Sequence, residues 1–292
     1  MTVVLTTAYG EECQFVIGPA NSESELDSLG RLCQHWSNLD TMELHTYRPV
    51  GRLIHPLGNM EQAVLALRPF LERLLESQRR GGASLKQLKL LLGEHATHDA
   101  VRWLLRGLLR LSSIDTLSSD WHVHSLLELN HAALRHLSLP HTFLSEGNHP
   151  WKTIVSELAL TLESLHMDGF VTSGELHCSD SMRALKKLTV GILQYQPYKS
   201  LHLLYSVAEW APNLRELSID VLEVLRTWYQ QCKDLSYRRF VSGCAFLEQM
   251  RIKRAYLLPP GLYGSHSYEE LGLVLDLRTR ADIREAFPEI CA

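Results

Sequence analysis

Aliphatic residues recur along the chain in a short pattern, Leu-x-x-Leu-x-Leu, in which another aliphatic residue can take any of the three leucine positions. The alternation at the end of the pattern is typical of a β-strand with one buried face. Successive copies begin 46, 26, 23, 28, 23, 29 and 33 residues apart, and all intervals but the first lie in or near the roughly 20–29 residues of a leucine-rich repeat. The eight copies begin at Leu39, Leu85, Leu111, Leu134, Leu162, Leu185, Leu214 and Leu247.

The segments between these copies predict amphipathic helices. Apolar side chains in residues 60–77, 99–109, 150–158 and 200–210 recur at spacings of three and four. Asp99 stands where an N-cap is expected, and Pro150 stands where a first helical turn is expected. Each unit is thus a short strand, a turn and a helix. Because one unit alone cannot bury its apolar face, the units are expected to stack into a continuous core.

The predicted fold is an α/β leucine-rich-repeat solenoid, with a curved parallel sheet on the concave face and helices on the convex face. We expect a single domain over residues 1–292, with about eight repeats in residues 24–254. Residues 1–23 predict a short strand pair that caps the N-terminal end. Residues 255–292 predict a C-terminal cap, in which 265–277 alternate as a strand and 281–287 form a short helix before Pro288.

One stretch resembles a known family. Trp210-Ala-Pro-Asn-Leu-Arg-Glu-Leu-Ser-Ile219 is similar to the leucine-rich repeats of F-box proteins and their relatives, in which a Cys-Pro-Asn-Leu or similar turn leads into the strand. Residues 36–44 and 133–139 are weaker matches, and the resemblance covers roughly residues 24–254. It implies substrate recognition within a cullin-type ubiquitin ligase. The chain departs from the family in its irregular repeat lengths, and it shows no F-box, the helical segment that opens with a Leu-Pro-x-Glu-like phrase.

Composition narrows the function classes. The chain has 55 leucines among 292 residues, 45% hydrophobic residues and a net charge of −4, which is typical of a globular protein and gives no general attraction to nucleic acid or anionic membranes. No apolar run approaches the roughly 18 residues that span a bilayer. The first thirty residues contain five acidic residues and no Lys or Arg, unlike a signal or transit peptide. The six cysteines form no CxxC pair, which favours free thiols and a cytoplasmic or nuclear location.

The residues between the motif leucines are expected to point out of the concave face, because side chains alternate along a strand. The face is predicted to be acidic around residues 168–220 and basic at residues 251–254, with two exposed leucines as an apolar anchor for a partner. The central exposed position is occupied in turn by Glu43, Lys89, Asp115, Ser138, His166, Thr189, Ser218 and Arg251. Further residues on the predicted face are Leu91, Leu117, His136, Asp168, Glu216, Asp220 and Lys253.

These features favour a non-catalytic scaffold or complex subunit that binds a partner protein through the concave face. The alternative is the ligase role implied by the resemblance. A third, distant alternative is an enzyme with a Cys/His site, although no P-loop, GxGxxG or GxSxG motif occurs. His122 and His124 alternate as strand residues do, but no Cys or HExxH frame accompanies them, so neither a metal nor a cofactor is predicted. Nucleic acid is not an expected partner, because residues 251–254 hold only three clustered cations.

Overall fold

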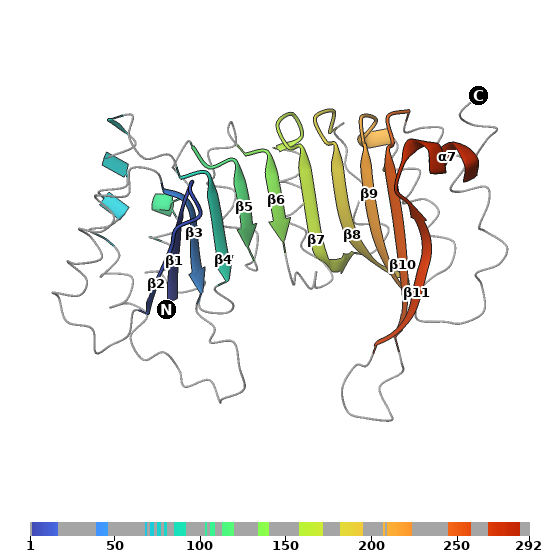
Figure 1. Cartoon of the computed structure of the whole chain (residues 1–292), viewed down its shortest axis with the longest axis horizontal. Helices are drawn as coiled ribbons and strands as arrows, with labels where there is room; N and C mark the ends of the chain where they lie inside the picture. The colour runs from blue at the N-terminus through green and yellow to red at the C-terminus, as the bar shows by residue number, and fades with distance from the viewer. Residues whose placement is uncertain are drawn as a thin grey trace. The chain divides into compact units, whose positions relative to one another are not determined.

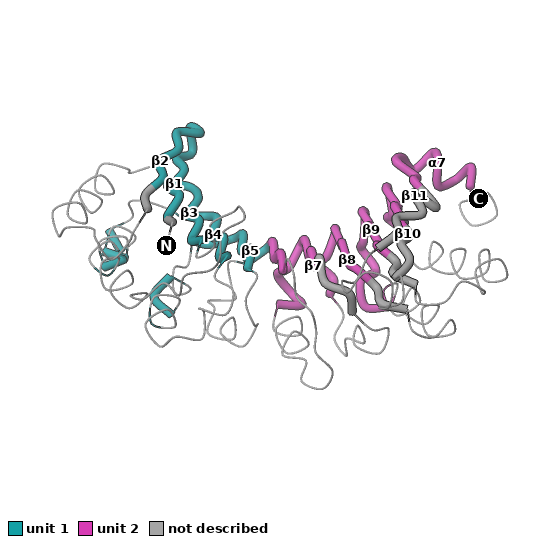
Figure 2. The backbone as a smooth tube through the Cα atoms, turned by 90° about the horizontal axis from the view of Figure 1, so that it is seen from below, with its two compact units in different colours: residues 1–135 teal, residues 136–292 magenta. Residues whose placement is uncertain are grey.

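The chain divides into two compact units, residues 1–135 and residues 136–292 (Figure 2). Each unit is built around an open sheet, in which antiparallel and parallel pairings are equal in number in the first unit and parallel pairings predominate in the second. The computed structural model describes residues 2–16, 39–45, 68, 71–72, 75–76, 79–80, 85–91, 103, 106–108, 113–119, 134–139, 158–171, 182–194, 207, 209–223, 245–257 and 268–286.

The first unit begins with an antiparallel pair and continues with parallel strands (Figure 1). Strands β1 (Thr2–Thr7) and β2 (Glu12–Val16) form a hairpin, and β1 also pairs antiparallel with β3 (Leu39–His45). Strands β4 (Gln87–Leu91) and β5 (Thr116–Ser119) then follow in parallel. Gly10 takes a φ of 81° in the hairpin turn, a conformation that costs a glycine little. The strand pair predicted within residues 1–23 is confirmed.

The second unit contains five parallel strands and one antiparallel edge strand (Figure 1). The last parallel strand pairs antiparallel with β11 (Tyr268–Leu277), and the short helix α7 (Arg280–Ala286) follows. The strand and closing helix predicted near the C-terminus are therefore confirmed. The parallel strands are β6 (His136–Leu139), β7 (Ser164–Val171), β8 (Lys187–Gln194), β9 (Glu216–Glu223) and β10 (Gln249–Leu257).

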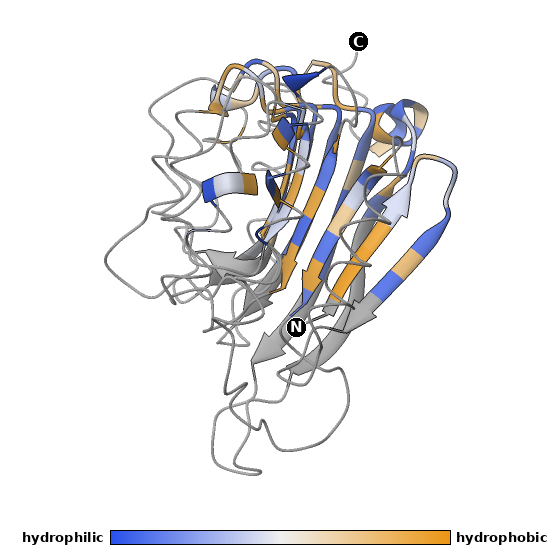
Figure 3. Ribbon diagram, turned by 90° about the vertical axis from the view of Figure 1, so that its left-hand side faces the viewer, coloured by the Kyte–Doolittle hydropathy of each residue, from blue (hydrophilic) through white to orange (hydrophobic). Residues whose placement is uncertain are grey.

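The sequence pattern explains why these strands form and which face they bury. In the second copy, Leu85, Leu88 and Leu90 are at most 1% exposed, while Lys89 between them is half-buried. Hydrophobic and hydrophilic residues alternate along the strands in the same way (Figure 3). Pairing in register sets Leu88 beside Met42 of β3. Each strand therefore extends a row of aliphatic side chains in the core of its unit.

The third copy of the motif lies three residues later than predicted. The buried positions are Ile114, Leu117 and Ser119, and Leu117 pairs in register with Leu88. The segment beginning at Leu111 ends in Thr116 and the correct copy ends in Ser119, a fully buried polar residue, so each of the two segments has an aliphatic residue at only two of the three positions. A search for aliphatic residues therefore does not distinguish the two alignments. With the first position at 114, the intervals of 26 and 23 residues become 29 and 20.

A recurring backbone contact fixes this alignment independently. The carbonyl oxygen of Lys86, directly after the first aliphatic position, accepts hydrogen bonds from the amides of Asp115 (3.0 Å) and Thr116 (3.1 Å) in the next copy. The carbonyl oxygen of Lys186 accepts the equivalent bonds from Arg215 (2.8 Å) and the following residue (2.9 Å). Asp115 is thus the counterpart of Arg215, and both precede their strands. The residues at the start of these strands are therefore hydrogen-bonded to the preceding copy of the motif.

The residues described between the strands include helical positions with buried apolar side chains. Leu71 and Leu108 are at most 1% exposed, and both lie in segments predicted as helices. A Cβ atom at Gly107 would overlap the Leu71 side chain, so these two segments of the first unit pack closely together. The predicted capping positions Asp99 and Pro150 lie outside the described residues. Within the described ranges, no helix combines the length and apolar character needed to cross a membrane.

Helix α7 begins with a reciprocal cap. The Asp282 amide donates to the Thr279 hydroxyl (3.2 Å), and the Asp282 carboxylate accepts from the amides of Thr279 (2.8 Å) and Arg278 (3.0 Å). The hydrogen bond with the Thr279 side chain, together with these amide bonds, lowers the pKa of Asp282 below its ordinary 3.8. The ionised carboxylate therefore contributes stability that is present above pH 3.8 and is lost as the pH falls through the lowered pKa.

We expect Asp282→Asn to reduce the thermal stability of the chain at neutral pH, with the difference from wild type shrinking as the pH falls below 3.8. Thermal unfolding followed by circular dichroism across this pH range measures the difference. Glu285→Gln, at an exposed position on the same helix, is the matched control. Its thermal stability should differ little from that of wild type at any pH in this range. A pH-independent difference for Asp282→Asn would show that the charge of the cap is unimportant.

Candidate protein-docking face

The outward positions of the parallel strands form the candidate site. In the first unit this face consists of Glu43, His45, Lys89, Leu91 and Ser118, which we call the first-unit polar face. Its counterpart, the second-unit polar face, consists of Ser138, His166, Thr189, Glu216, Ser218, Asp220, Arg251 and Lys253. In both units the burial alternation along each strand separates these residues from the core.

Most of the residues predicted for the face lie where the alternation placed them. Six of the eight central positions are half-buried between two buried neighbours: Glu43, Lys89, Ser138, His166, Thr189 and Ser218. Arg251, the last central position, is exposed. His136 and Asp220 are exposed, whereas Glu216 and Lys253 are half-buried. Asp168 lies in β7, but its side chain is outside those that the structure describes.

Two predicted face residues need correction. Leu117 was predicted to be exposed, yet it is fully buried because the third copy is shifted by three residues. Asp115 was predicted at the central outward position, which Ser118 occupies instead, beside Lys89. The apolar anchor of two neighbouring leucines does not exist on this face. Leu91 remains half-buried there, paired in register with His45.

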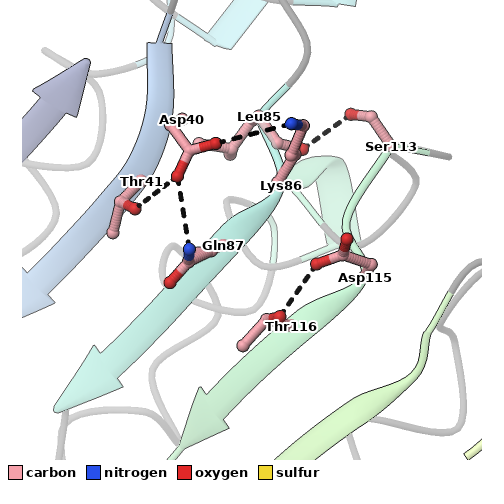
Figure 4. Close-up of polar contacts among 8 residues, drawn as sticks. All are labelled: Asp40, Thr41, Leu85, Lys86, Gln87, Ser113, Asp115 and Thr116. Atoms are coloured by element: carbon pink, nitrogen blue, oxygen red, sulfur yellow. Dashed lines mark hydrogen bonds and ion pairs between the residues drawn. The ribbon is translucent and has the colours of Figure 1, made fainter. Parts of the chain in front are cut away.

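Charged groups of the first-unit polar face bind one another. The Glu43 carboxylate oxygen Oε2 lies 2.8 Å from His45 Nε2 and 3.2 Å from Lys89 Nζ. At the beginning of β3, Asp40 Oδ2 accepts hydrogen bonds from the Thr41 hydroxyl (3.2 Å) and from the side chain of Gln87, the first residue of β4 (3.2 Å) (Figure 4). These contacts satisfy the polar groups from within the chain, which lowers the tendency of this part of the face to bind charged partners.

Similar pairs neutralise part of the second unit. Lys186 Nζ lies 2.6 Å from Glu163, and Lys187 Nζ lies 2.7 Å from Glu216. Exposed pairs of this kind contribute only about 0.2–1 kcal/mol each, so they specify which strands pair more than they stabilise the sheet. Glu216, predicted as part of an acidic surface, is thus neutralised by a lysine of the preceding repeat. Aligning the two repeats by their motif leucines would have revealed the pair in the sequence.

The C-terminal strands present charges that lack such pairing. Within the part of the chain that the structure describes, the side chains of Arg251 and Asp220 make no ion pair or hydrogen bond. Arg251 lies in register between Ser218 of β9 and Asp276 of β11. Asp276 is already engaged, because its Oδ2 accepts from Arg278 Nε at 2.9 Å. An exposed guanidinium is therefore left on the second-unit polar face.

The described residues offer little for metal or thiol chemistry. No three His, Cys, Asp or Glu side chains among them are grouped so that they could hold a metal ion. Cys13 is a free, half-buried thiol in β2. His122 and His124, the two histidines weighed as metal ligands from the sequence, lie outside the described residues.

No family model matches the chain, and no curated protein matches it either. The structure defines an open mixed sheet in the first unit and an open, mostly parallel sheet in the second, and the parallel strands of both repeat one pattern of burial and of backbone hydrogen bonds.

Proposed function

We propose that the chain is a leucine-rich-repeat protein that binds another protein through the outward face of its sheet, as a scaffold or complex subunit without catalysis. The observation that carries this proposal is the row of polar side chains along the second-unit polar face, in which Arg251 and Asp220 have no partner among the described residues. Exposed charges of opposite sign beside short hydroxyl side chains provide polar contacts and specificity for a protein surface.

The repeat class is supported by two features. One is the backbone contact that recurs between successive copies of the motif. The other is the turn of the F-box-like stretch, where the Asn213 side chain amide donates to the Arg183 carbonyl oxygen of the preceding repeat at 2.8 Å. A Pro-Asn-Leu turn in this position joins two repeats, which accounts for its recurrence in repeats of the family that the sequence resembles. The helices of such a solenoid would cover the opposite side of the sheet.

The location we propose is the cytosol or nucleus. The scattered cysteines fit a reducing compartment, and Cys13, the one cysteine among the described residues, is free. The mixed charges of the second-unit polar face favour a protein surface over nucleic acid or an anionic membrane, because electrostatic binding to either of these needs an excess of cations.

The test blocks the second-unit polar face without altering the core. Thr189→Gln combined with Ser218→Gln places two long, uncharged side chains on neighbouring strands of this face. Ala245→Gln combined with Ala281→Gln is the matched control, since both alanines are exposed and lie off the face. Each tagged full-length chain is purified under native conditions from its source cell, and the proteins that accompany it are quantified by mass spectrometry.

We expect a stoichiometric partner to accompany the wild type and the control, and to fall at least about fivefold with the face variant. Equal recovery with both variants would exclude the face as the contact surface. The identity of the partner distinguishes the two roles. Components of a cullin-type ligase in the set that depends on the face would support the substrate-recognition alternative, whereas a fixed set without them would support a structural subunit.

A further inference from the structure

We propose that Arg251 is the anchor of the second-unit polar face, and that it binds a carboxylate of an acidic segment in the partner protein. This inference rests on the proposed function and adds the chemistry of the partner to it. Arginine is suited to such a role, because its planar guanidinium can donate two parallel hydrogen bonds to one carboxylate.

The Arg251 guanidinium is available to a partner. Arg251 is exposed on β10, and directly opposite it on β11 stands Asp276, the obvious internal partner. The Asp276 carboxylate instead lies 2.8 Å from Arg278 Nη2 and accepts from Arg278 Nε. Arg278 follows the strand directly, so the carboxylate is neutralised locally. Arg251 therefore keeps its hydrogen-bond donors for a group from outside the described chain.

The side chains beside Arg251 leave space for a partner's carboxylate. Its register neighbour on β9 is Ser218, and the next residue along this row is Thr189 on β8. Both side chains are short, so a partner's carboxylate can approach the guanidinium from this side. Their hydroxyl groups can donate to the second oxygen or to the partner's backbone carbonyls. The row thus combines one strong cationic donor with weaker neutral donors.

The charges around Arg251 favour an acidic protein segment over a nucleic acid. Glu216 of this face is paired with Lys187, and Asp220, which has no partner among the described residues, adds a negative charge in register with Lys253. A polyanion with closely spaced phosphates would be repelled by these carboxylates, whereas a protein segment can place single carboxylates where the cations are. The first-unit polar face offers no equivalent, because Glu43 engages Lys89 as well as His45 there.

The experiment uses the full chain and a defined probe, a fluorescein-labelled hexaglutamate peptide with blocked ends, titrated by fluorescence anisotropy at low ionic strength. Hexaserine with the same label is the neutral reference. We expect Arg251→Gln to weaken hexaglutamate binding at least about tenfold. Arg280→Gln is the matched control, because Arg280 is also exposed but lies on α7, and it should change binding less than about twofold.

A second variant tests the mechanism through a residue away from the contact. Arg278→Gln removes the group that holds Asp276, which is then able to pair with Arg251 across the two strands. Hexaglutamate binding should weaken clearly more than in Arg280→Gln, although both variants lose one exposed positive charge. Circular dichroism spectra and thermal unfolding of all three variants establish that they remain folded.

Absence of hexaglutamate binding, equal weakening in all three variants, or tighter Arg251-dependent binding of a twelve-base-pair DNA duplex would each overturn the proposal. The outcome is separable from the test of the proposed function. Loss of the cellular partner in the Thr189→Gln, Ser218→Gln variant, with wild-type recovery in Arg251→Gln, would reject the anchor and keep the docking face. If the Thr189→Gln, Ser218→Gln variant recovers the same cellular partners as wild type while hexaglutamate binding still depends on Arg251, the docking function is rejected and the anchor is kept.

Discussion

Leu137→Asp is expected to destabilise the chain by more than about 4 kcal/mol, because it places an unpaired carboxylate in the core of the second unit. Leu137 is 1% exposed and occupies the middle aliphatic position of its motif, in register with Leu165 of β7. Chemical denaturation followed by circular dichroism measures the loss. Leu137 packs in a row of buried side chains from neighbouring strands, so the whole second unit should unfold in one cooperative transition at a lower denaturant concentration.

Ser138→Asp is the matched control for this substitution. Ser138 is the next residue along β6 and points to the opposite face, where the same carboxylate remains in contact with water. Its stability should lie within about 0.5 kcal/mol of wild type. Similar denaturation midpoints for Leu137→Asp and wild type would show that the assignment of inward and outward positions is wrong.

Leu117→Ala is expected to cost about 2–5 kcal/mol, as is typical when a fully buried leucine is truncated and leaves a cavity. Leu117 is 0% exposed and lies in register with Leu88, although the sequence pattern predicts it on the surface. The measurement is the free energy of unfolding from denaturant titrations. This substitution therefore separates the two alignments of the third repeat by an effect well above experimental error.

Leu91→Ala provides the comparison, because Leu91 is the half-buried leucine that does lie on the first-unit polar face. Its truncation removes less buried area and should cost less than about 1 kcal/mol. If Leu117→Ala and Leu91→Ala lowered the free energy of unfolding equally, Leu117 would lie on the surface. That result would also restore the predicted apolar anchor for a partner.

The sequence by itself determined the strands and their buried faces. A strand alternates its side chains with a period of two, so the motif leucines identify the inward residues locally. Seven of the eight copies, the N-terminal strand pair, β11 and α7 follow from patterns of this kind. The outward positions Glu43, Lys89, Ser138, His166, Thr189, Ser218 and Arg251 were predicted by the same alternation.

The alignment of the third repeat was decided only by the tertiary structure. Two overlapping segments fit the pattern equally well, because each carries a hydroxyl residue, Thr116 or Ser119, where the third aliphatic residue is expected. The hydrogen bonds from Asp115 and Thr116 to the Lys86 carbonyl oxygen select between them. Such contacts join residues that are far apart in the sequence, so no local pattern contains them.

The tertiary structure also decided which charges on the face are paired. Glu43 with Lys89 and Lys187 with Glu216 come from different repeats, and the intervals between repeats vary from 20 to 33 residues within the regular part of the series. Their proximity depends on the register between strands. Among the described residues Arg251 has no partner, because Asp276, which lies opposite it on the antiparallel strand β11, binds Arg278 instead. The sequence determines which side chains face outward, and the pairing of strands determines which of them keep a charge available for a partner.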